Sequence, residues 1–152
     1  NGESIWQIKQ HIGYISNALH MDYRVGVSAL NTIISGFFDS IGLYQPPTDE
    51  QKNIAMQWLQ LLGLDNKQGT PFTQFSYGDQ RMLLIARAMV KHPTLLILDE
   101  PCLGLDEANR LRVLMLIEKI CEASESTVIY VNHHREDRIK GIDHYLAMED
   151  FK

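Results

Sequence analysis

The chain has 152 residues, of which 45% are hydrophobic, and this is enough for one domain with a buried core. Its formal net charge of −5 at pH 7 argues against a basic nucleic-acid-binding surface. No stretch approaches the roughly 18 consecutive apolar residues of a membrane-spanning helix, so an integral membrane segment is also disfavoured.

The first part of the chain predicts an entry segment followed by a strand. Residues 5–8 and 11–16 alternate apolar and polar side chains, and we interpret the second stretch as the strand. Asn17 is expected to begin the loop that follows it.

The middle of the chain predicts helices and no strands. Residues 27–38 and 48–62 have apolar side chains at helical spacing. Thr48 and Gln51 form a candidate capping box for the second helix, and Gly63 is a typical stop signal. Three aromatic side chains of this region belong either to a partner-binding surface or to internal packing: Phe37, Phe38 and Tyr44.

A further helix is expected after Ser76, which is its natural N-cap. A helix start exposes unpaired N–H groups, and Gly78 lacks a side chain where an anion could approach the backbone. The start is therefore a candidate phosphate-binding end. An ordinary helix cap has the same pattern, so this stretch alone does not decide between the two.

The most informative pattern is a short apolar strand that ends in two carboxylates. Residues 94–98 read as a buried strand of a parallel sheet, and Asp99 and Glu100 follow at its end. Ligands of open α/β sheets bind beyond the carboxyl ends of the strands, so this acidic pair is placed for a metal and a nucleophile. A turn capped by Asp99 is the alternative.

The last part of the chain continues the alternation of helix and strand. Residues 107–123 predict an amphipathic crossover helix, and residues 127–131 predict a strand parallel to the previous one. Residues 134–140 indicate a short charged helix that ends at Gly141, and residues 142–148 indicate a last strand. The core face of the crossover helix is expected to carry Leu111, Leu114, Met115, Ile117 and Ile120.

Four of these stretches together resemble the ATP-binding cassette ATPases. Residues 75–79 (FSYGD) are similar to the signature of that family, and residues 95–100 are similar to its Walker B strand with the following glutamate. Residues 103–106 (LGLD) resemble its D-loop, and residues 128–133 resemble its switch-histidine segment. The order and the approximate spacing are those of the family.

The resemblance implies an α/β fold with a P-loop NTPase-like parallel sheet that is incomplete in this chain. Residues 1–23 and 92–152 would be parts of the α/β core, and residues 24–91 would form an inserted helical signature subdomain. The P-loop motif G-x-x-x-x-G-K-[ST] occurs nowhere in the sequence. Because the chain also begins at Asn1 and not at Met, we expect an inactive fragment whose P-loop strand and helix lie upstream.

The resemblance also implies roles for the residues at the strand ends. Asp99 would hold Mg²⁺ through a water, and Glu100 would orient or deprotonate the water that attacks ATP. His133 would donate a hydrogen bond to the γ-phosphate, with a one-residue shift to His134 left open. Asn17 falls where the family has a Q-loop glutamine; its shorter side chain calls for a bridging water, and a plain loop asparagine is the alternative.

The remaining candidate residues would act on a nucleotide held by an opposite cassette. Ser76 and Gly78 would touch its γ-phosphate, and Asp106 would contact the opposite P-loop or simply cap the next helix. Tyr77 replaces the first glycine of the usual signature, and Asp79 replaces the usual glutamine. An anion at residue 79 suits a helix N-terminus but repels phosphate, so we expect weakened nucleotide binding in trans.

A closer likeness connects the chain with molybdate-transport ATP-binding proteins that carry two cassettes. It rests on HIGYIS, GFFDSIGLYQ, VKHPTLLILDEP and NHHREDR and extends from Ile12 to about Leu146. It implies a cytoplasmic protein, peripheral at the inner face of the membrane, whose partners are a second cassette and a membrane permease subunit, with no direct nucleic-acid contact.

Other functions stay open at this point. A cassette head of the chromosome-maintenance or DNA-repair type would be preceded by long heptads, and residues 1–74 show none. A catalytically idle regulatory cassette would fit the departures in the signature. Cys102 and Cys121 are few and widely spaced, which is typical of reduced thiols. A zinc site that combines them with His133 and His134 is the alternative, but it would lack the usual C-x-x-C pair.

Overall fold

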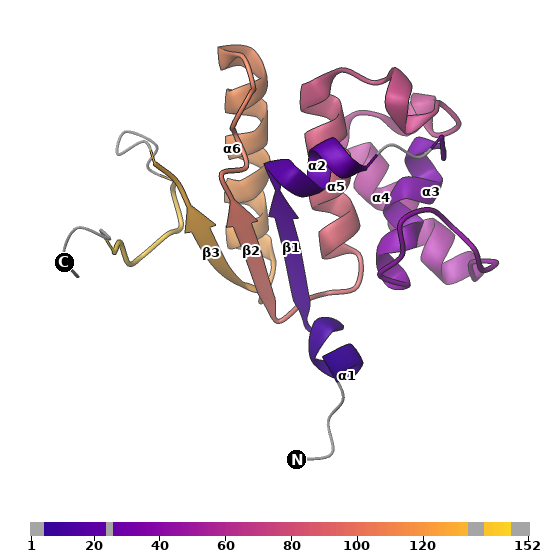
Figure 1. Ribbon diagram of the computed structural model, residues 1–152, viewed down its shortest axis with the longest axis horizontal. Coiled ribbons are helices and arrows are strands. Elements are labelled where there is room, and N and C mark those ends of the chain that lie inside the picture. The colour runs from indigo at the N-terminus through magenta and orange to yellow at the C-terminus, as the bar shows by residue number, and fades with distance from the viewer. Residues whose placement is uncertain (1–4, 24–25, 134–138, 147–152) are drawn as a thin grey trace.

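The computed structural model describes residues 5–23, 26–133 and 139–146, and Figure 1 shows their arrangement. Three parallel strands form one sheet in the order β1 (Ile12–Ser16), β2 (Leu95–Asp99) and β3 (Thr127–Val131). In the register of the sheet, Ser16 lies opposite Asp99, and Asp99 lies opposite Val131. The carboxyl ends of all three strands therefore meet at one edge, as the sequence predicted for a parallel α/β fold.

Helices connect the strands. The long connection from β1 to β2 contains α2 (Asn17–Asp22), α3 (Ala29–Ile34), α4 (Asp49–Leu62) and α5 (Tyr77–Met89). Three short 3₁₀ turns lie between these helices: η1 (Ser35–Phe37), η2 (Asp65–Lys67) and η3 (Phe72–Gln74). Helix α6 (Glu107–Ala123) crosses from β2 to β3, and α1 (Ile5–Lys9) precedes β1. The inserted helices lie to one side of the sheet in Figure 1.

The ends of α4 follow the predicted capping chemistry. The Thr48 hydroxyl accepts a hydrogen bond from the Gln51 N–H at 3.1 Å, and the Gln51 side chain accepts one from the Thr48 N–H at 3.0 Å. Gly63 ends the helix with φ of 73°, in the left-handed region that favours glycine. Both predicted boundaries of this helix are confirmed.

The core lies between one face of the sheet and helices α5 and α6, and it continues between α5 and helices α3 and α4. Ile15, Leu96 and Leu98 are fully buried on that face. A Cβ on Gly13 would lie 3.1 Å from the carbonyl oxygen of Ala88, which shows how closely β1 approaches α5. Figure 1 shows α6 against the same sheet.

Among the described residues, nothing covers the opposite face of the sheet. Tyr14, Ile97 and Ile129 stand in one row across the three strands, because they are register partners. Tyr14 and Ile129 are each 46% exposed, and Val131 near them is 41% exposed. Parallel sheets are normally covered on both faces, so this apolar row lacks a covering layer within the described residues.

Several sequence predictions about the first residues need correction. Residues 5–8, predicted only as an entry segment with alternating side chains, belong to helix α1. Asn17 begins helix α2, not a loop, because the Ser16 hydroxyl accepts a hydrogen bond from the Leu19 N–H at 3.0 Å and caps a helix there.

The predictions for the last third are correct only in part. On α6, Ile117 and Ile120 are buried and Leu114 packs against the core, as predicted. Leu111 and Met115 are 49% and 59% exposed, whereas Val113 and Leu116 are buried, so the core face is rotated from the predicted one. Residues 142–146 form no strand, and the rest of that predicted strand lies outside the described residues. The charged helix predicted at residues 134–140 falls mostly on residues 134–138, which also lie outside them.

Of the three aromatic residues singled out in the middle region, two are packed inside and one is exposed. Phe37 and Phe38 pack against the core, whereas Tyr44 is 83% exposed. No helix among the described residues is both long and apolar enough to cross a membrane.

Candidate functional site

Asp99 closes strand β2 at the edge where the three strands end. Its carboxylate is partly exposed, and Oδ2 accepts a hydrogen bond from the Tyr14 hydroxyl at 3.4 Å. Across the described residues, no three His, Cys, Asp or Glu side chains gather as a protein metal cage. A single open carboxylate fits Mg²⁺ in particular, because this ion keeps several waters and takes phosphate oxygens as further ligands.

Glu100 follows with an unusual backbone conformation. Its φ is 49°, in the left-handed region that costs a residue with a side chain about 1–2 kcal/mol. A hydrogen bond from its N–H to the carbonyl oxygen of Val131, 2.8 Å long, holds it there. Strain of this kind is often found at functional sites, although His92 and Asp39 share the positive φ here.

His133 lies beside Glu100. Its Nε2 is 2.9 Å from Oε1 of the carboxylate, and the contact is an ion pair when the imidazole is protonated. The glutamate follows β2 and the histidine follows β3, so the meeting of strand ends brings the two together. A carboxylate and an imidazole in contact can hold or pass a proton.

The start of α5 is built as the sequence predicted. The Ser76 hydroxyl accepts a hydrogen bond from the Asp79 N–H at 3.2 Å, which makes Ser76 the N-cap. Ser76 itself is exposed, so the positive end of this 13-residue helix faces outward beside it.

Gly78 serves helix packing at this point. A Cβ on Gly78 would lie 2.3 Å from Cγ and Oδ1 of Asn109, a residue in the first turn of α6. The sequence suggested that the missing side chain leaves room for an anion. The structure adds that it leaves room for the close approach of α6.

Asp79 is paired within the chain. Its Oδ1 is 2.8 Å from Nη2 of Arg112, and Nη1 of Arg112 donates to Oδ1 of Asn109 at 3.2 Å. The positive charge of Arg112 offsets the negative charge that would otherwise stand alone at the helix start. Asp106 in turn caps α6, accepting from the Asn109 N–H at 2.8 Å, so its alternative role as a cap is realised.

Asn17 is held by two donors. Its Oδ1 accepts from the Tyr77 hydroxyl at 2.7 Å and from Nη2 of Arg81 at 3.0 Å. An oxygen already bonded to a guanidinium is a poor direct ligand for a second cation. The Asn17 contacts therefore agree better with an indirect role at a metal than with ligation.

Arg81 is the centre of a buried polar cluster that the sequence reading missed. The side chain is fully buried, and burial lowers the pKa of its guanidinium. It donates to Nδ1 of His20 at 2.8 Å, and the pKa of His20 is lowered by burial and by the neighbouring cation. A signal existed in the sequence, because Arg81 lies among Gly78, Met82 and Ile85 on the core face of the predicted helix.

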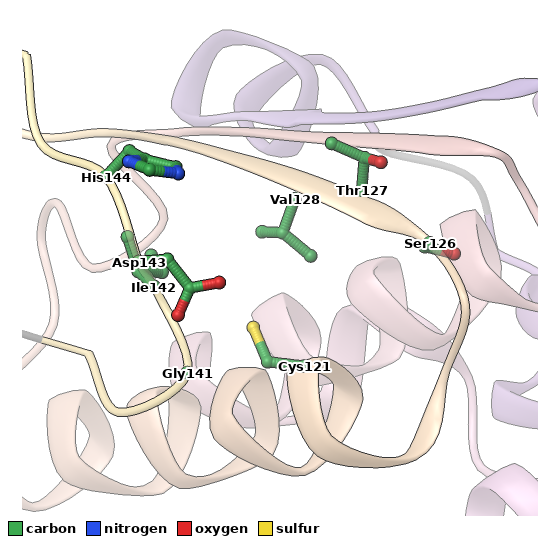
Figure 2. Close-up of a pocket in the computed structure, with 8 residues that line it drawn as sticks. All are labelled: Cys121, Ser126, Thr127, Val128, Gly141, Ile142, Asp143 and His144. Atoms are coloured by element: carbon green, nitrogen blue, oxygen red, sulfur yellow. The ribbon is translucent and has the colours of Figure 1, made fainter.

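A cavity of about 360 Å³ lies away from these residues (Figure 2). The end of α6, the start of β3 and residues 141–144 line it, and the Cys121 thiol and the Asp143 carboxylate point toward it. Burial first, and then Glu118 and Asp143, raise the pKa of the Cys121 thiol, so it stays protonated. None of the predicted site residues lines this cavity.

The structure thus places the predicted residues in two linked groups. Asp99, Glu100 and His133 occupy the edge where the strands end, and Ser76 to Asp79 occupy the start of α5. Asn17 directly follows β1 at that edge, and the Tyr77 hydroxyl on its Oδ1 links the start of α5 to the end of β1. Sequence reasoning missed four supporting residues: His20, Arg81, Asn109 and Arg112.

Comparison with known protein families identifies the family to which the chain belongs. A model of the family described as ABC transporter matches residues 1–103, which is more than half of the chain. The chain belongs to the ABC transporter family. Its resemblance to ATP-binding cassette ATPases is thereby confirmed.

The relatives within this family are ATP-binding proteins. The chain is 49% identical to the ABC transporter ATP-binding protein ModF of Escherichia coli (strain K12) over 147 residues, which cover 96% of this chain and 30% of ModF. It is 30% identical to the molybdate import ATP-binding protein MolC of Haemophilus influenzae, over 84% of this chain and 49% of MolC. The chain thus spans less than two thirds of either relative.

Solved structures of ABC proteins share the fold. A metal-chelate type ABC transporter in an inward-facing conformation matches with a TM-score of 0.66 and 30% identity, over 81% of this chain and 48% of its own. The cassette MJ0796, a dimer bound to ADP and Pi, matches with a TM-score of 0.65 over 88% of this chain and 59% of its own. Its 23% identity supports the P-loop NTPase fold alone.

Proposed function

We propose that this chain is part of an ABC cassette that binds and hydrolyses Mg-ATP at a composite site between two cassettes. The observation that supports this best is the contact of 2.9 Å between His133 and Glu100, next to Asp99 at the sheet edge. Phosphoryl transfer needs positioned groups and charge stabilisation more than covalent chemistry, and these three residues can supply both.

Each of the three residues has its own task. Asp99 would hold Mg²⁺ through a water, and an ion held there would supply positive charge against the phosphates. Glu100 orients the attacking water or takes its proton, and His133 donates a hydrogen bond to the γ-phosphate. Asn17 contributes indirectly, through a water or through its neighbours, because its oxygen already has two donors.

The residues at the start of α5 act on the nucleotide of the opposite cassette. Ser76 and the N–H groups near Gly78 face the γ-phosphate, and Tyr77 borders the same surface, where it is 37% exposed. Asp106 contacts the opposite P-loop in addition to capping α6. Asp79 is compatible with a phosphate nearby because Arg112 pairs with it at 2.8 Å.

The P-loop is proposed to come from a segment upstream of this chain. The open row of Tyr14, Ile97 and Ile129 supports this, because a strand and helix carrying G-x-x-x-x-G-K-[ST] would extend the sheet and cover that face. Residues 24–91 then form the helical subdomain, and residues 1–23 and 92–152 contribute to the α/β core. The chain alone would be inactive.

Molybdate transport is the role that we propose, and the name of one relative supports it. The name of MolC states molybdate import, and the chain is 30% identical to it. The partners would be a second cassette, in the same chain or in a dimer, and a membrane permease subunit. The location would be the cytoplasm or the inner face of the membrane.

A regulatory cassette that binds nucleotide without turnover is the second candidate. The occupied oxygen of Asn17 favours it, since this residue stands where the family has its Q-loop glutamine. Under this alternative the fold and the association with a second cassette are retained, and hydrolysis is lost.

Two substitutions in the full-length protein test the composite site. Glu100→Gln keeps the shape of the side chain and the metal residue Asp99, so nucleotide still binds while turnover falls at least ~100-fold. The protein should then accumulate in a closed, associated state with ATP. Ser76→Arg places a bulky cation at the helix start, so association and turnover are both lost.

Sedimentation with ATP separates the two variants. Glu125→Gln, an exposed acid beyond α6, is the control and should behave like the unmodified protein. If Glu100→Gln fails to associate while Ser76→Arg does associate, the proposal of a composite site between two cassettes is wrong. A full-length protein with no ATPase activity, but with ATP-dependent association, would favour the regulatory candidate.

A further inference from the structure

Arg81 is a buried cation that no described carboxylate neutralises. It lies in the second turn of α5 with a fully buried side chain, and it takes part in none of the ion pairs among the described residues. Burying an arginine is unfavourable unless its N–H groups find acceptors. Its acceptors come from two separate parts of the chain, and their positions indicate what the residue does.

The first set of acceptors lies in the segment between Glu100 and Asp106. Nη1 of Arg81 donates to the carbonyl oxygen of Pro101, and Nη2 donates to that of Leu103 at 3.2 Å. This segment has no regular secondary structure. Its internal hydrogen bonds include those from the N–H groups of Leu103 and Leu105, at 3.1 and 3.2 Å. The guanidinium therefore ties α5 to the backbone that separates the two proposed site residues.

The second set lies on α2. Nε of Arg81 donates to Nδ1 of His20 at 2.8 Å, and Nη2 also donates to Oδ1 of Asn17 at 3.0 Å. The His20 ring is stacked on the Tyr77 ring, with centroids 4.0 Å apart and planes 12° apart. The guanidinium carbon in turn lies 5.2 Å from the centre of the Tyr77 ring.

His20 is itself fixed in one tautomer. Because Nδ1 accepts from Arg81, the ring proton is on Nε2, which lies 2.9 Å from Oε1 of Gln80. The Gln80 amide then donates to the carbonyl oxygens of Phe72 and Phe75, at 3.1 and 3.2 Å. The chain of contacts thus extends to the turn that precedes Ser76.

We propose that Arg81 is a positioning residue for the reaction. It holds the segment from Pro101 to Leu103 and the residues Asn17 and His20 in one arrangement around the start of α5. In this way it fixes where Glu100 and Asp106 lie relative to the signature. The role in the reaction rests on the proposed function, whereas the structural link does not.

A lysine cannot replace this arginine. The guanidinium presents five N–H groups in a rigid fork, and here they point toward His20, Asn17 and two carbonyl groups at once. A lysine has one nitrogen on a flexible stem, so Arg81→Lys keeps the charge but loses the simultaneous contacts.

Hydrogen exchange on the present chain tests the link without nucleotide. In Arg81→Lys, the amides of Leu103 and Leu105 should exchange at least ~10-fold faster than in the unmodified chain. Arg87→Lys is the matched control. Arg87 lies on the same helix and donates to Oγ of Ser35 and the carbonyl oxygen of Ser40, at 3.1 and 2.6 Å. It should leave Leu103 and Leu105 unchanged, and equal effects of both variants would overturn the proposal.

A measurement on the unmodified chain covers the case in which Arg81→Lys does not fold. The Nε–H of buried Arg81 should exchange with water at least ~100-fold more slowly than the Nε–H of Arg112, whose side chain is 45% exposed. Nitrogen shifts should also show the His20 proton on Nε2. Equal exchange rates, or a proton on Nδ1, would overturn the link.

Steady-state kinetics of the full-length protein tests the role in the reaction. Arg81→Lys should lower kcat for ATP hydrolysis roughly 10- to 100-fold, because misplacing a catalytic group by about 1 Å costs this much. KM should stay within about threefold, because the P-loop would be intact. Arg87→Lys should keep kcat. An unchanged kcat in Arg81→Lys would overturn the positioning role, whereas an unmodified protein without ATPase activity would contradict the proposed function and leave the exchange result standing.

Discussion

Nε2 of His133 lies 2.9 Å from Oε1 of Glu100, although 33 positions separate the two residues in the sequence. The contact depends on the sheet, since the N–H of Glu100 also donates to the carbonyl oxygen of Val131 at 2.8 Å. The His133 side chain is 80% exposed, and this contact with Glu100 helps to hold it at the edge of the sheet. The two proposed catalytic side chains are thus positioned as a pair.

We expect His133→Ala to lower turnover of the full-length protein by at least ~100-fold, as for loss of a group that stabilises or transfers a proton. KM for ATP should change little, because the phosphate cradle would be unaffected. Steady-state hydrolysis assays check this. His11→Ala changes an exposed histidine before β1 and should be without effect. Turnover within twofold of normal would remove His133 from the mechanism.

Acidification should destabilise the chain through His20. Burial lowers the pKa of His20 below its usual 6.5, so the unfolded state binds more protons when the pH falls through that value. Stability is therefore fully present above about pH 6.5 and is lost below it, by at most about 1.4 kcal/mol per pH unit for one proton.

Urea unfolding between pH 7.5 and 5.5 measures this dependence. His20→Asn keeps a hydrogen-bond acceptor for Arg81 but does not titrate, so its stability should depend less on pH in this range. His92→Asn is the control, because His92 is exposed and asparagine tolerates its φ of 52°. A slope in His20→Asn as steep as in the unmodified chain would contradict the expectation.

Gly78→Ala should destabilise the chain by about 1–3 kcal/mol, because the new Cβ would meet the Asn109 side chain at 2.3 Å. Chemical denaturation measures the effect. Adding Asn109→Gly should recover part of the loss, which a double-mutant cycle reports as coupling. Gly69→Ala should be nearly neutral, since nothing lies within 4 Å of its Cβ position. Additive effects of Gly78→Ala and Asn109→Gly would show that the clash is not the cause.

The chain alone should bind Mg-ATP weakly, because the motif that would hold the β- and γ-phosphates is not in its sequence. Isothermal titration calorimetry is the measurement. A dissociation constant below ~100 µM, or about 5.5 kcal/mol of binding free energy, would mean that other residues hold the phosphates. Binding should strengthen in the full-length protein.

Much of this fold could be predicted because local and global signals agree. The capping box of Thr48 with Gln51, the Ser76 cap and the strand ending at Asp99 each depend on short-range chemistry. The failures have local causes as well. Residues 5–8 are too few to separate a strand from a helix by alternation, and α2 begins at Asn17 because Ser16 supplies a cap that the alternation hides.

The supporting cluster could not be predicted in the same way. Arg81 contacts residues 61 and 64 positions earlier and 20 and 22 positions later, and no local pattern reports such pairings. Its place on an apolar helix face was visible, but the acceptors were not. The pairing of Asp79 with Arg112 is also long-range, so sequence reasoning found the charge and missed its partner.

The hydrogen bond from Tyr77 to Asn17 limits how the signature can be engineered. Tyr77→Gly would restore the first glycine of the usual signature, but it would remove the hydroxyl that donates to Asn17 and the ring that stacks on His20. Grafting a standard five-residue signature into this chain would therefore also require new residues at positions 17 and 20. The unit that can be exchanged between cassettes is therefore the signature together with the residues at positions 17 and 20, and not the linear motif alone.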